Sequence, residues 1–150
     1  MTTVVRKSSE VPYSCAEMYA LVNDVEHYAD FLPNCSQCIV HHRDEDEVQA
    51  TVVLSAMGMH KSFTTKNRLQ HNKMIEIRLL DGPFSHLEGF WKFDANESGG
   101  CTISFYLEFE FANRMFLMLM GSIFEEVTKK VFDAFHTRAV EVYGERITAV

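Results

Sequence analysis

The sequence predicts an α+β fold in which a curved antiparallel sheet of about six or seven strands wraps around a long C-terminal α-helix. Between residues 37 and 111, apolar and polar residues alternate with a period of two, which is typical of strands with one buried face. After Asn113 the period changes to 3.6, which indicates an amphipathic helix. Helical spacing also precedes the sheet, so the predicted order is one strand, two short helices, a meander and the long helix.

The composition is that of one globular domain. The chain has 150 residues, of which 47% are hydrophobic, and its 14 basic and 21 acidic side chains give a formal net charge of −7. We therefore expect residues 1–150 to form a single domain. An acidic chain lacks the positive field that nonspecific nucleic-acid binding uses, so we expect no DNA partner. No apolar run approaches the ~20 residues of a membrane span, and residues 1–10 lack the apolar core of a signal peptide.

The N-terminal part of the chain predicts a strand followed by helix. Residues 2–11 are rich in β-branched side chains and end at Pro12, as a strand would. Ser14 and Glu17 form a capping box, which marks the start of a helix. Apolar residues then recur at spacings of three and four up to Pro33, so we expect two short consecutive helices or one kinked helix.

The middle of the chain predicts an antiparallel meander with one apolar face. Turn-forming residues, mainly Asp, Asn and Gly, separate its alternating segments. The clearest of these segments are 48–56, 62–69, 75–79, 87–94 and 101–111.

The C-terminal residues predict one amphipathic helix of about 30 residues, ~45 Å long at 1.5 Å per residue. A helix of this length crosses the whole apolar face of the sheet and leaves a space between the two. Either side chains or a ligand fill that space. The apolar stripe of the helix comprises Met120, Phe124, Val127, Val131, Phe135, Ala139 and Val142.

Segments along nearly the whole chain resemble one known family. They are residues 11–28, Phe31-Leu-Pro33, Phe63-Thr-Thr-Lys-Asn67, Asp81-Gly-Pro-Phe84, and residues 87–93, 109–111 and 134–144. In this order and spacing they resemble the coenzyme Q-binding protein family, whose bacterial members are also known as ribosome association toxins. That family lies within the START-like (polyketide cyclase/dehydrase, SRPBCC) superfamily. One departure is Ser85-His86, where we expect the family to carry a basic residue, so no role of a cation is carried over to this position.

The resemblance implies a helix-grip (START-like) fold that encloses a hydrophobic tunnel between sheet and C-terminal helix. It implies two different functions. One is binding of ubiquinone or a related isoprenoid lipid in support of respiratory electron transport, and the other is binding to the large ribosomal subunit, which blocks 70S formation. We expect a bacterial, cytoplasmic location, peripheral to the inner membrane for the lipid role, and no required cofactor. The superfamily also contains cyclases and dehydratases, which is a third class of function.

The predicted tunnel lining consists of inward-facing strand residues and the helix side chains opposite them. For any one aromatic residue in this set, ordinary core packing is the commoner explanation. Thr65 and Asn67 also occupy inward-facing positions of their strand. A buried Asn side chain without hydrogen-bond partners lowers the free energy of unfolding by about 1–3 kcal/mol. Asn67 therefore either donates to a ligand carbonyl or a bound water, or bonds the backbone of a bent strand. The predicted lining comprises Tyr28, Phe31, Phe63, Thr65, Asn67, Trp91, Phe93, Phe105, Leu107, Phe109, Phe116, Met120 and Phe124.

Residues 115–120, Met-Phe-Leu-Met-Leu-Met, are apolar around the whole circumference of the predicted helix. Two interpretations are open. In one, the sheet rim and residues 28–33 bury these turns on all sides. In the other, they form a flexible, Met-rich lid over the tunnel mouth that contacts a membrane surface while a lipid transfers, with Gly121 as a hinge.

The four cysteines are expected to be reduced thiols, and we expect no metal site. Cys35 and Cys38 form a Cys-x-x-Cys pair close to His41 and His42, but no second pair accompanies them. On a strand, Cys38 and His42 share a face that His41 does not, so tetrahedral zinc coordination needs ligands from elsewhere.

No carboxylate or histidine is expected at the inward-facing positions of the strands. The alternation places the strand glutamates on the outer face of the sheet; they are Glu76, Glu88, Glu108 and Glu110. A proton-transfer catalyst needs a titratable group within reach of its substrate. His86, expected in a loop, is the remaining candidate, and a solvated loop histidine is its simpler explanation. We therefore expect that the protein is not an enzyme.

Three cations occupy outward-facing positions on strands that are predicted to be neighbours: Lys66, Arg68 and Arg78. They form a candidate contact surface for the ribosome or for anionic lipid headgroups. The simpler explanation is a solvated face whose cations are offset by neighbouring glutamates.

Overall fold

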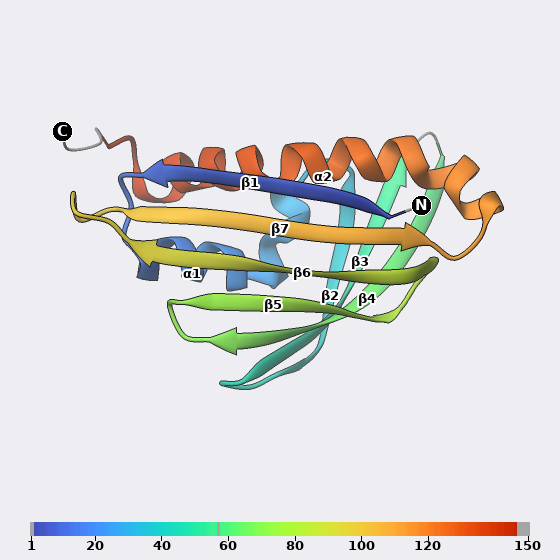
Figure 1. Ribbon diagram of the computed structural model, residues 1–150, viewed down its shortest axis with the longest axis horizontal. Coiled ribbons are helices and arrows are strands. Elements are labelled where there is room, and N and C mark those ends of the chain that lie inside the picture. The colour runs from blue at the N-terminus through green and yellow to red at the C-terminus, as the bar shows by residue number, and fades with distance from the viewer. Residues whose placement is uncertain (1, 57, 147–150) are drawn as a thin grey trace.

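The computed structural model describes residues 2–56 and 58–146 and has the predicted order of elements (Figure 1). Its strands are β1 (Thr3–Val11), β2 (Cys35–Arg43), β3 (Glu47–Ala56), β4 (Met59–Gln70), β5 (Met74–Asp81), β6 (Phe84–Ala95) and β7 (Cys101–Phe111). Its helices are α1 (Cys15–Asn23), the 3-10 helix η1 (Val25–Asp30) and α2 (Arg114–Tyr143).

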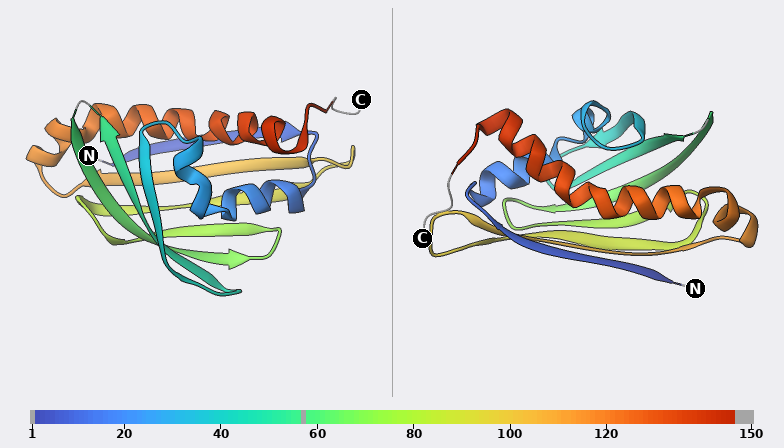
Figure 2. Two further views of the ribbon diagram at one scale, coloured as in Figure 1. Left: turned by 180° about the vertical axis from the view of Figure 1, so that it is seen from behind. Right: turned by 90° about the horizontal axis from the view of Figure 1, so that it is seen from above.

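The strands form one antiparallel sheet in the order β1-β7-β6-β5-β4-β3-β2. Figure 2 shows that this sheet curves and that α2, α1 and η1 all lie on its concave side. Gly89 of β6 pairs with Leu107 of β7, and a Cβ at Gly89 would lie 2.1 Å from the carbonyl oxygen of Tyr106. Only glycine fits there. The predicted α+β class and the helix-grip arrangement are confirmed.

Helix α1 begins where the capping box predicted. The Ser14 hydroxyl accepts a hydrogen bond from the Glu17 backbone N–H at 3.1 Å, and the Glu17 carboxylate accepts one from the Ser14 N–H at 2.9 Å. The prediction of two short helices is also correct, although the second, η1, is a 3-10 helix rather than an α-helix.

The Glu17 carboxylate also anchors the C-terminal end of the described chain. The Arg146 guanidinium donates to both of its oxygens, at 2.6 and 2.9 Å, and these bonds, with the capping bond from Ser14, lower the Glu17 pKa from 4.5 to about 2. A depressed carboxyl pKa stabilises the fold above pH 4.5, and this contribution is lost as the pH falls towards 2.

We therefore expect Glu17→Gln to lower the free energy of unfolding at pH 7 by about 1 kcal/mol, because the lost ion pair is solvent-exposed. The difference between wild type and variant should shrink as the pH falls from 5 to about 2.5. Urea unfolding at several pH values measures it. A difference that stays constant over this range would contradict the assigned role of Glu17.

Helix α2 has the predicted length of 30 residues and is uninterrupted through Gly121, the residue predicted as a hinge. Its N-cap is Asn113, whose side-chain oxygen accepts from the Phe116 N–H at 3.0 Å. The predicted stripe is wrong at Val142, which is exposed near the helix end. Phe132, outside the stripe, is buried and lies parallel to Trp91 with ring centroids 6.0 Å apart. The concave sheet covers more of the helix than a single stripe, which explains this burial.

All four cysteines are free thiols. Cys15 and Cys101 lie with their sulfur atoms 3.0 Å apart, where the first turn of α1 meets the start of β7. None of the helices in the described ranges is long and apolar enough to cross a membrane.

Candidate functional site

A cavity of about 130 Å³ lies between the concave face of the sheet and the middle of α2. Strands β3 to β7, helix α2 and the segment that joins η1 to β2 all contribute to its lining. Eight residues of the predicted set line it: Tyr28, Phe63, Thr65, Asn67, Trp91, Phe105, Leu107 and Phe124. Residues that are far apart in sequence therefore meet around one apolar space.

Five residues of the predicted set do not line this cavity. Phe93 packs edge-on against Tyr19, with centroids 5.7 Å apart, towards the α1 end of the sheet. Phe109 packs against Phe124, 4.7 Å away, among the rings that close the opposite end. Alternation along a strand predicts which face a residue occupies but not its distance from the cavity, which explains both errors.

The other three errors come from segments around the helices. The Phe31 ring lies outside the cavity, against Phe135 at 5.2 Å and beneath the Arg138 guanidinium at 5.0 Å. Phe116 is half-buried in the first turn of α2, and Met120 lines a separate small pocket. The helix begins beyond the cavity, so its first two turns do not reach it.

Thirteen lining residues lie outside the predicted set. Several carried a usable signal, because Val127, Val131 and Phe135 belong to the apolar stripe of the helix and Ile75, Ile77 and Leu87 have inward parity. Leu32 also carried a signal, because it ends the helical spacing that runs up to Pro33, whereas Pro33 itself follows no periodic pattern. The thirteen are Val22, Leu32, Pro33, Cys35, Val52, Leu54, Ile75, Ile77, Leu87, Val127, Thr128, Val131 and Phe135.

Thr65 and Asn67 supply most of the polar character of the lining. The Thr65 hydroxyl donates to the side-chain oxygen of Asn67 at 3.2 Å. Within the described ranges, the Asn67 amide nitrogen has no hydrogen-bond partner, and its side chain bonds no backbone group. The amide N–H groups of Asn67 are therefore available to an acceptor in the cavity.

The titratable groups in the lining are poorly suited to exchange protons near neutral pH. The Tyr28 hydroxyl donates to the backbone carbonyl of Val22, and burial raises its pKa well above the ordinary tyrosine value. Burial also raises the pKa of the Cys35 thiol. The described lining residues include no carboxylate and no histidine.

His86 is not in a loop, which corrects the sequence-based expectation. It belongs to β6, and its ring nitrogen lies 2.7 Å from the Glu108 carboxylate and 3.8 Å from that of Glu88. These three are the one group of metal-ligating side chains found among the described residues. They lie on the outer face of the sheet, away from the cavity. In the Cys-x-x-Cys region, His41 bonds Thr51 instead of a cysteine.

The three outward cations lie together on the outer face, as their parity predicted. Lys66 and Arg78 are register partners on β4 and β5. Lys66 forms an ion pair with Glu47 at 3.4 Å and Arg78 with Glu88 at 3.3 Å, whereas Arg68 is exposed. Part of the positive charge of this surface is therefore neutralised by its neighbours.

The apolar start of α2 is exposed, so burial on all sides is the wrong interpretation for residues 115–119. Met115, Leu117, Met118 and Leu119 all face solvent, whereas Met120 is buried. Residues 28–33 lie too far along the helix axis to cover these turns, because Tyr28 and Phe31 pack against Phe135. The rim of the sheet borders only one side of them, where Phe109 and Phe111 line a shallow pocket with Leu117.

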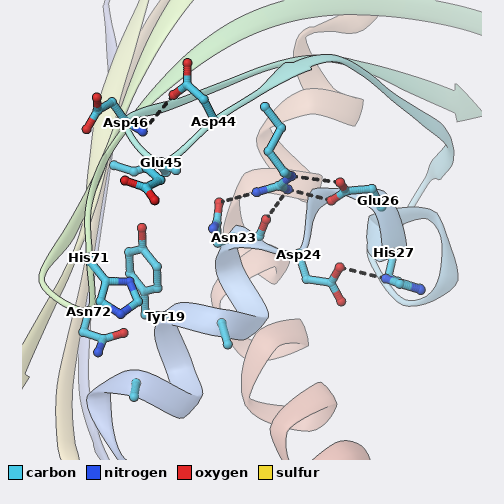
Figure 3. A pocket seen from close by; sticks show the side chains of 14 residues that line it. Tyr19, Asn23, Asp24, Glu26, His27, Asp44, Glu45, Asp46, His71 and Asn72 are labelled. Atoms are coloured by element: carbon cyan, nitrogen blue, oxygen red, sulfur yellow. Dashed lines mark hydrogen bonds and ion pairs between the residues drawn. The ribbon is translucent and has the colours of Figure 1, made fainter.

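A second hollow, which the sequence did not predict, has a volume of about 1260 Å³. Figure 3 shows the residues that line it. This acidic groove lies between α1 and η1 on one side and the β2–β3 and β4–β5 turns on the other. Arg43 donates to both Glu26 oxygens, at 2.6 and 2.9 Å, and lowers the Glu26 pKa. No described residue lines both the groove and the cavity. The carboxylates of the groove are Asp24, Glu26, Asp44, Glu45 and Asp46.

A curved seven-stranded sheet, a long C-terminal helix and an apolar cavity between them define a START-like helix-grip domain. Residues 11–136 match the family described as "Polyketide cyclase / dehydrase and lipid transport". The ribosome association toxin RatA of Escherichia coli K12 is 40% identical over 142 residues, which cover 95% of this chain and 90% of that protein. The chain therefore belongs to this family, and within it to the group of the ribosome association toxins and coenzyme Q-binding proteins.

Other relatives extend the comparison. The mitochondrial coenzyme Q-binding protein COQ10 homolog B of Xenopus laevis is 27% identical over 144 residues, covering 93% of this chain and 59% of that protein. An 18 kDa protein of Caulobacter crescentus has a TM-score of 0.69 at 25% identity, covering 97% and 99% of the two chains. The Zhui aromatase/cyclase of Streptomyces sp. R1128 has a TM-score of 0.78 at 16% identity, covering 97% and 100%. The last likeness shows the fold alone.

Proposed function

We propose that the protein binds a hydrophobic ligand, an isoprenoid quinone or a similar lipid, in the cavity between the sheet and α2. The observation that carries this proposal is an apolar cavity into which one unpaired amide donor, that of Asn67, projects. Ligand sites of this kind are mostly apolar, with a few polar groups that fix orientation. A quinone ring matches both properties, since it is flat and apolar and carries carbonyl acceptors.

The size of the cavity limits which part of the ligand it encloses. Its volume of about 130 Å³ is close to the ~150 Å³ of an engineered cavity that binds benzene. It therefore accommodates about one ring, and in our proposal the prenyl tail leaves the cavity towards the surface. The name of the Xenopus relative, a coenzyme Q-binding protein, supports this ligand class.

The proposed role is that of a binding protein that supports respiratory electron transport, without a required cofactor. It works in the cytoplasm and exchanges its lipid at the surface of the inner membrane. Because the described lining residues include no carboxylate and no histidine, we favour binding over cyclase-like catalysis.

Trp91 provides the test, because it is the single tryptophan of the chain and lines the cavity. Titration with decylubiquinone should quench Trp91 fluorescence with saturation, since the quinone ring would lie against the indole. Linear, unsaturable quenching equal to that of free tryptophan in solution would contradict the proposal.

Asn67→Leu should weaken decylubiquinone binding about tenfold, because the carbonyl would lose its one hydrogen-bond donor. Fluorescence titration measures the dissociation constant. Arg68→Leu is the matched control on the outer face of the same strand, and should leave the constant unchanged. Equal affinity in wild type and Asn67→Leu would assign Asn67 a structural role only.

A second candidate function is association with the large ribosomal subunit. Relatives 40% identical over 95% of this chain carry the name ribosome association toxin, and the outer face offers Lys66, Arg68 and Arg78 to a phosphate backbone. Charge reversal of all three residues should abolish co-sedimentation with large subunits at low salt. Lys129→Glu with Lys130→Glu, on α2, is the control. Absence of wild-type co-sedimentation would remove this candidate.

A further inference from the structure

The first turns of α2 form the most exposed apolar surface of the described chain. Met118 is 78% exposed and Met115 58%. Four of the nine exposed large apolar residues fall between positions 115 and 119, whereas the others are scattered over the molecule. A contiguous apolar surface of this kind marks a binding site rather than an ordinary protein surface.

This surface lies at one end of the molecule, beside the hairpin that joins β3 to β4. Figures 1 and 2 show the start of α2 projecting past the sheet at the same end as that hairpin. Met120 and Ile123 of α2 line a small pocket together with Ala56, Met59 and Lys61 of the hairpin. The two elements therefore border one pocket.

Cations flank the apolar residues at this end. Residues 111–124 and 55–62 contain Arg114, His60 and Lys61 and no aspartate or glutamate, and the nearest carboxylate is that of Glu110, which lines a shallow pocket with Arg114 and Leu117. The acidic turn 44–46 precedes β3, whereas the β3–β4 hairpin follows it, so the two lie at opposite ends of a 10-residue strand, about 30 Å apart. Apolar side chains flanked by cations favour an anionic lipid surface, and the acidic groove would point away from it.

A small pocket at this end lies next to the cavity. Leu54 lines both the cavity and the small pocket beneath Met120 and Ile123. Leu54 therefore separates the cavity from an apolar pocket that lies next to the start of α2. This is the side on which a tail too large for the cavity would emerge.

We propose that Met115, Leu117, Met118 and Leu119 dock on an anionic phospholipid surface, with Arg114 and Lys61 against its headgroups. The lipid ligand passes between this surface and the cavity through the gap lined by Leu54, Met59 and Ile123. The portal rests on the proposed lipid-binding function, whereas the docking surface has its own test.

Flotation with phosphatidylcholine vesicles that contain about one-third phosphatidylglycerol tests docking. The wild type should float with these vesicles, and less at high salt. Leu117→Ser with Met118→Ser should reduce the bound fraction at least tenfold, whereas Val140→Ser with Val142→Ser, exposed at the other end of α2, should not. Equal flotation of both double variants, or none for the wild type, would overturn the docking surface. A wild-type dimer that Leu117→Ser with Met118→Ser converts to monomer would assign the surface to a second copy of the chain instead.

Loading kinetics test the portal separately from ligand binding. Transfer of decylubiquinone from these vesicles, followed by Trp91 quenching, should slow at least tenfold in Leu117→Ser with Met118→Ser. The dissociation constant for decylubiquinone added from ethanol should stay that of the wild type. If this variant keeps both the wild-type dissociation constant and the wild-type loading rate, the proposed portal is wrong, whereas the proposed lipid-binding function still stands. Absence of saturable binding in the wild type would overturn the function itself.

Discussion

Val127→Trp is expected to weaken ligand binding roughly 100-fold, which corresponds to about 2.7 kcal/mol. Val127 is buried on the face of α2 that closes the cavity, where it packs against Cys35 and Leu54. An indole at this position would occupy much of the 130 Å³ that the ligand needs. The overpacked variant should lose about 1–3 kcal/mol of stability and remain folded.

The matched control is Val142→Trp, the same substitution on an exposed position of the same helix. It should bind decylubiquinone as the wild type does, in a titration followed by calorimetry so that the added tryptophan does not interfere. Wild-type affinity in Val127→Trp, with its fold verified by circular dichroism, would show that the ligand does not bind in this cavity.

Trp91→Ala is expected to lower the free energy of unfolding by about 3–5 kcal/mol. Trp91 is 3% exposed, and its ring lies 4.4 Å from that of Phe105 and 5.0 Å from that of Phe135. It therefore joins the middle of the sheet to α2. Its loss removes both contacts and enlarges the cavity, and the surrounding rings cannot collapse fully into the gap.

Urea unfolding followed by circular dichroism measures this loss without the tryptophan signal. Phe90→Ala is the control, because Phe90 is the neighbouring residue on the outer face of β6 and stacks only partly buried on Tyr106, 5.5 Å away. It should cost about 1 kcal/mol. Equal losses in the two variants would contradict a core centred on Trp91.

Much of the fold was predictable because its signals are local. The Ser14–Glu17 capping box, the alternation along β3 to β7 and the 3.6-residue period of α2 each depend on neighbours in sequence. The errors arise where tertiary packing decides. Phe132 is buried because a concave sheet covers more than one stripe of the helix, and Val142 is exposed because it lies near the helix end.

The sequence predicted which face of the sheet carries the candidate site, but not how far the cavity reaches along the strands. Inward parity correctly placed Thr65, Asn67 and Trp91 around one space, yet it also included Phe93 and Phe109, which lie beyond the ends of the cavity. The position of a cavity along a strand depends on the curvature of the sheet, which no local pattern encodes. The acidic groove has the same origin, since it forms only where two turns and α1 meet in space.

The most direct test of the central claim is mass spectrometry of lipids extracted from the protein after purification from bacterial cells. The proposed function predicts an isoprenoid quinone or related lipid bound to the wild type and greatly depleted in Val127→Trp. A wild-type protein that carries no more lipid than Val127→Trp would contradict a ligand site between the sheet and α2.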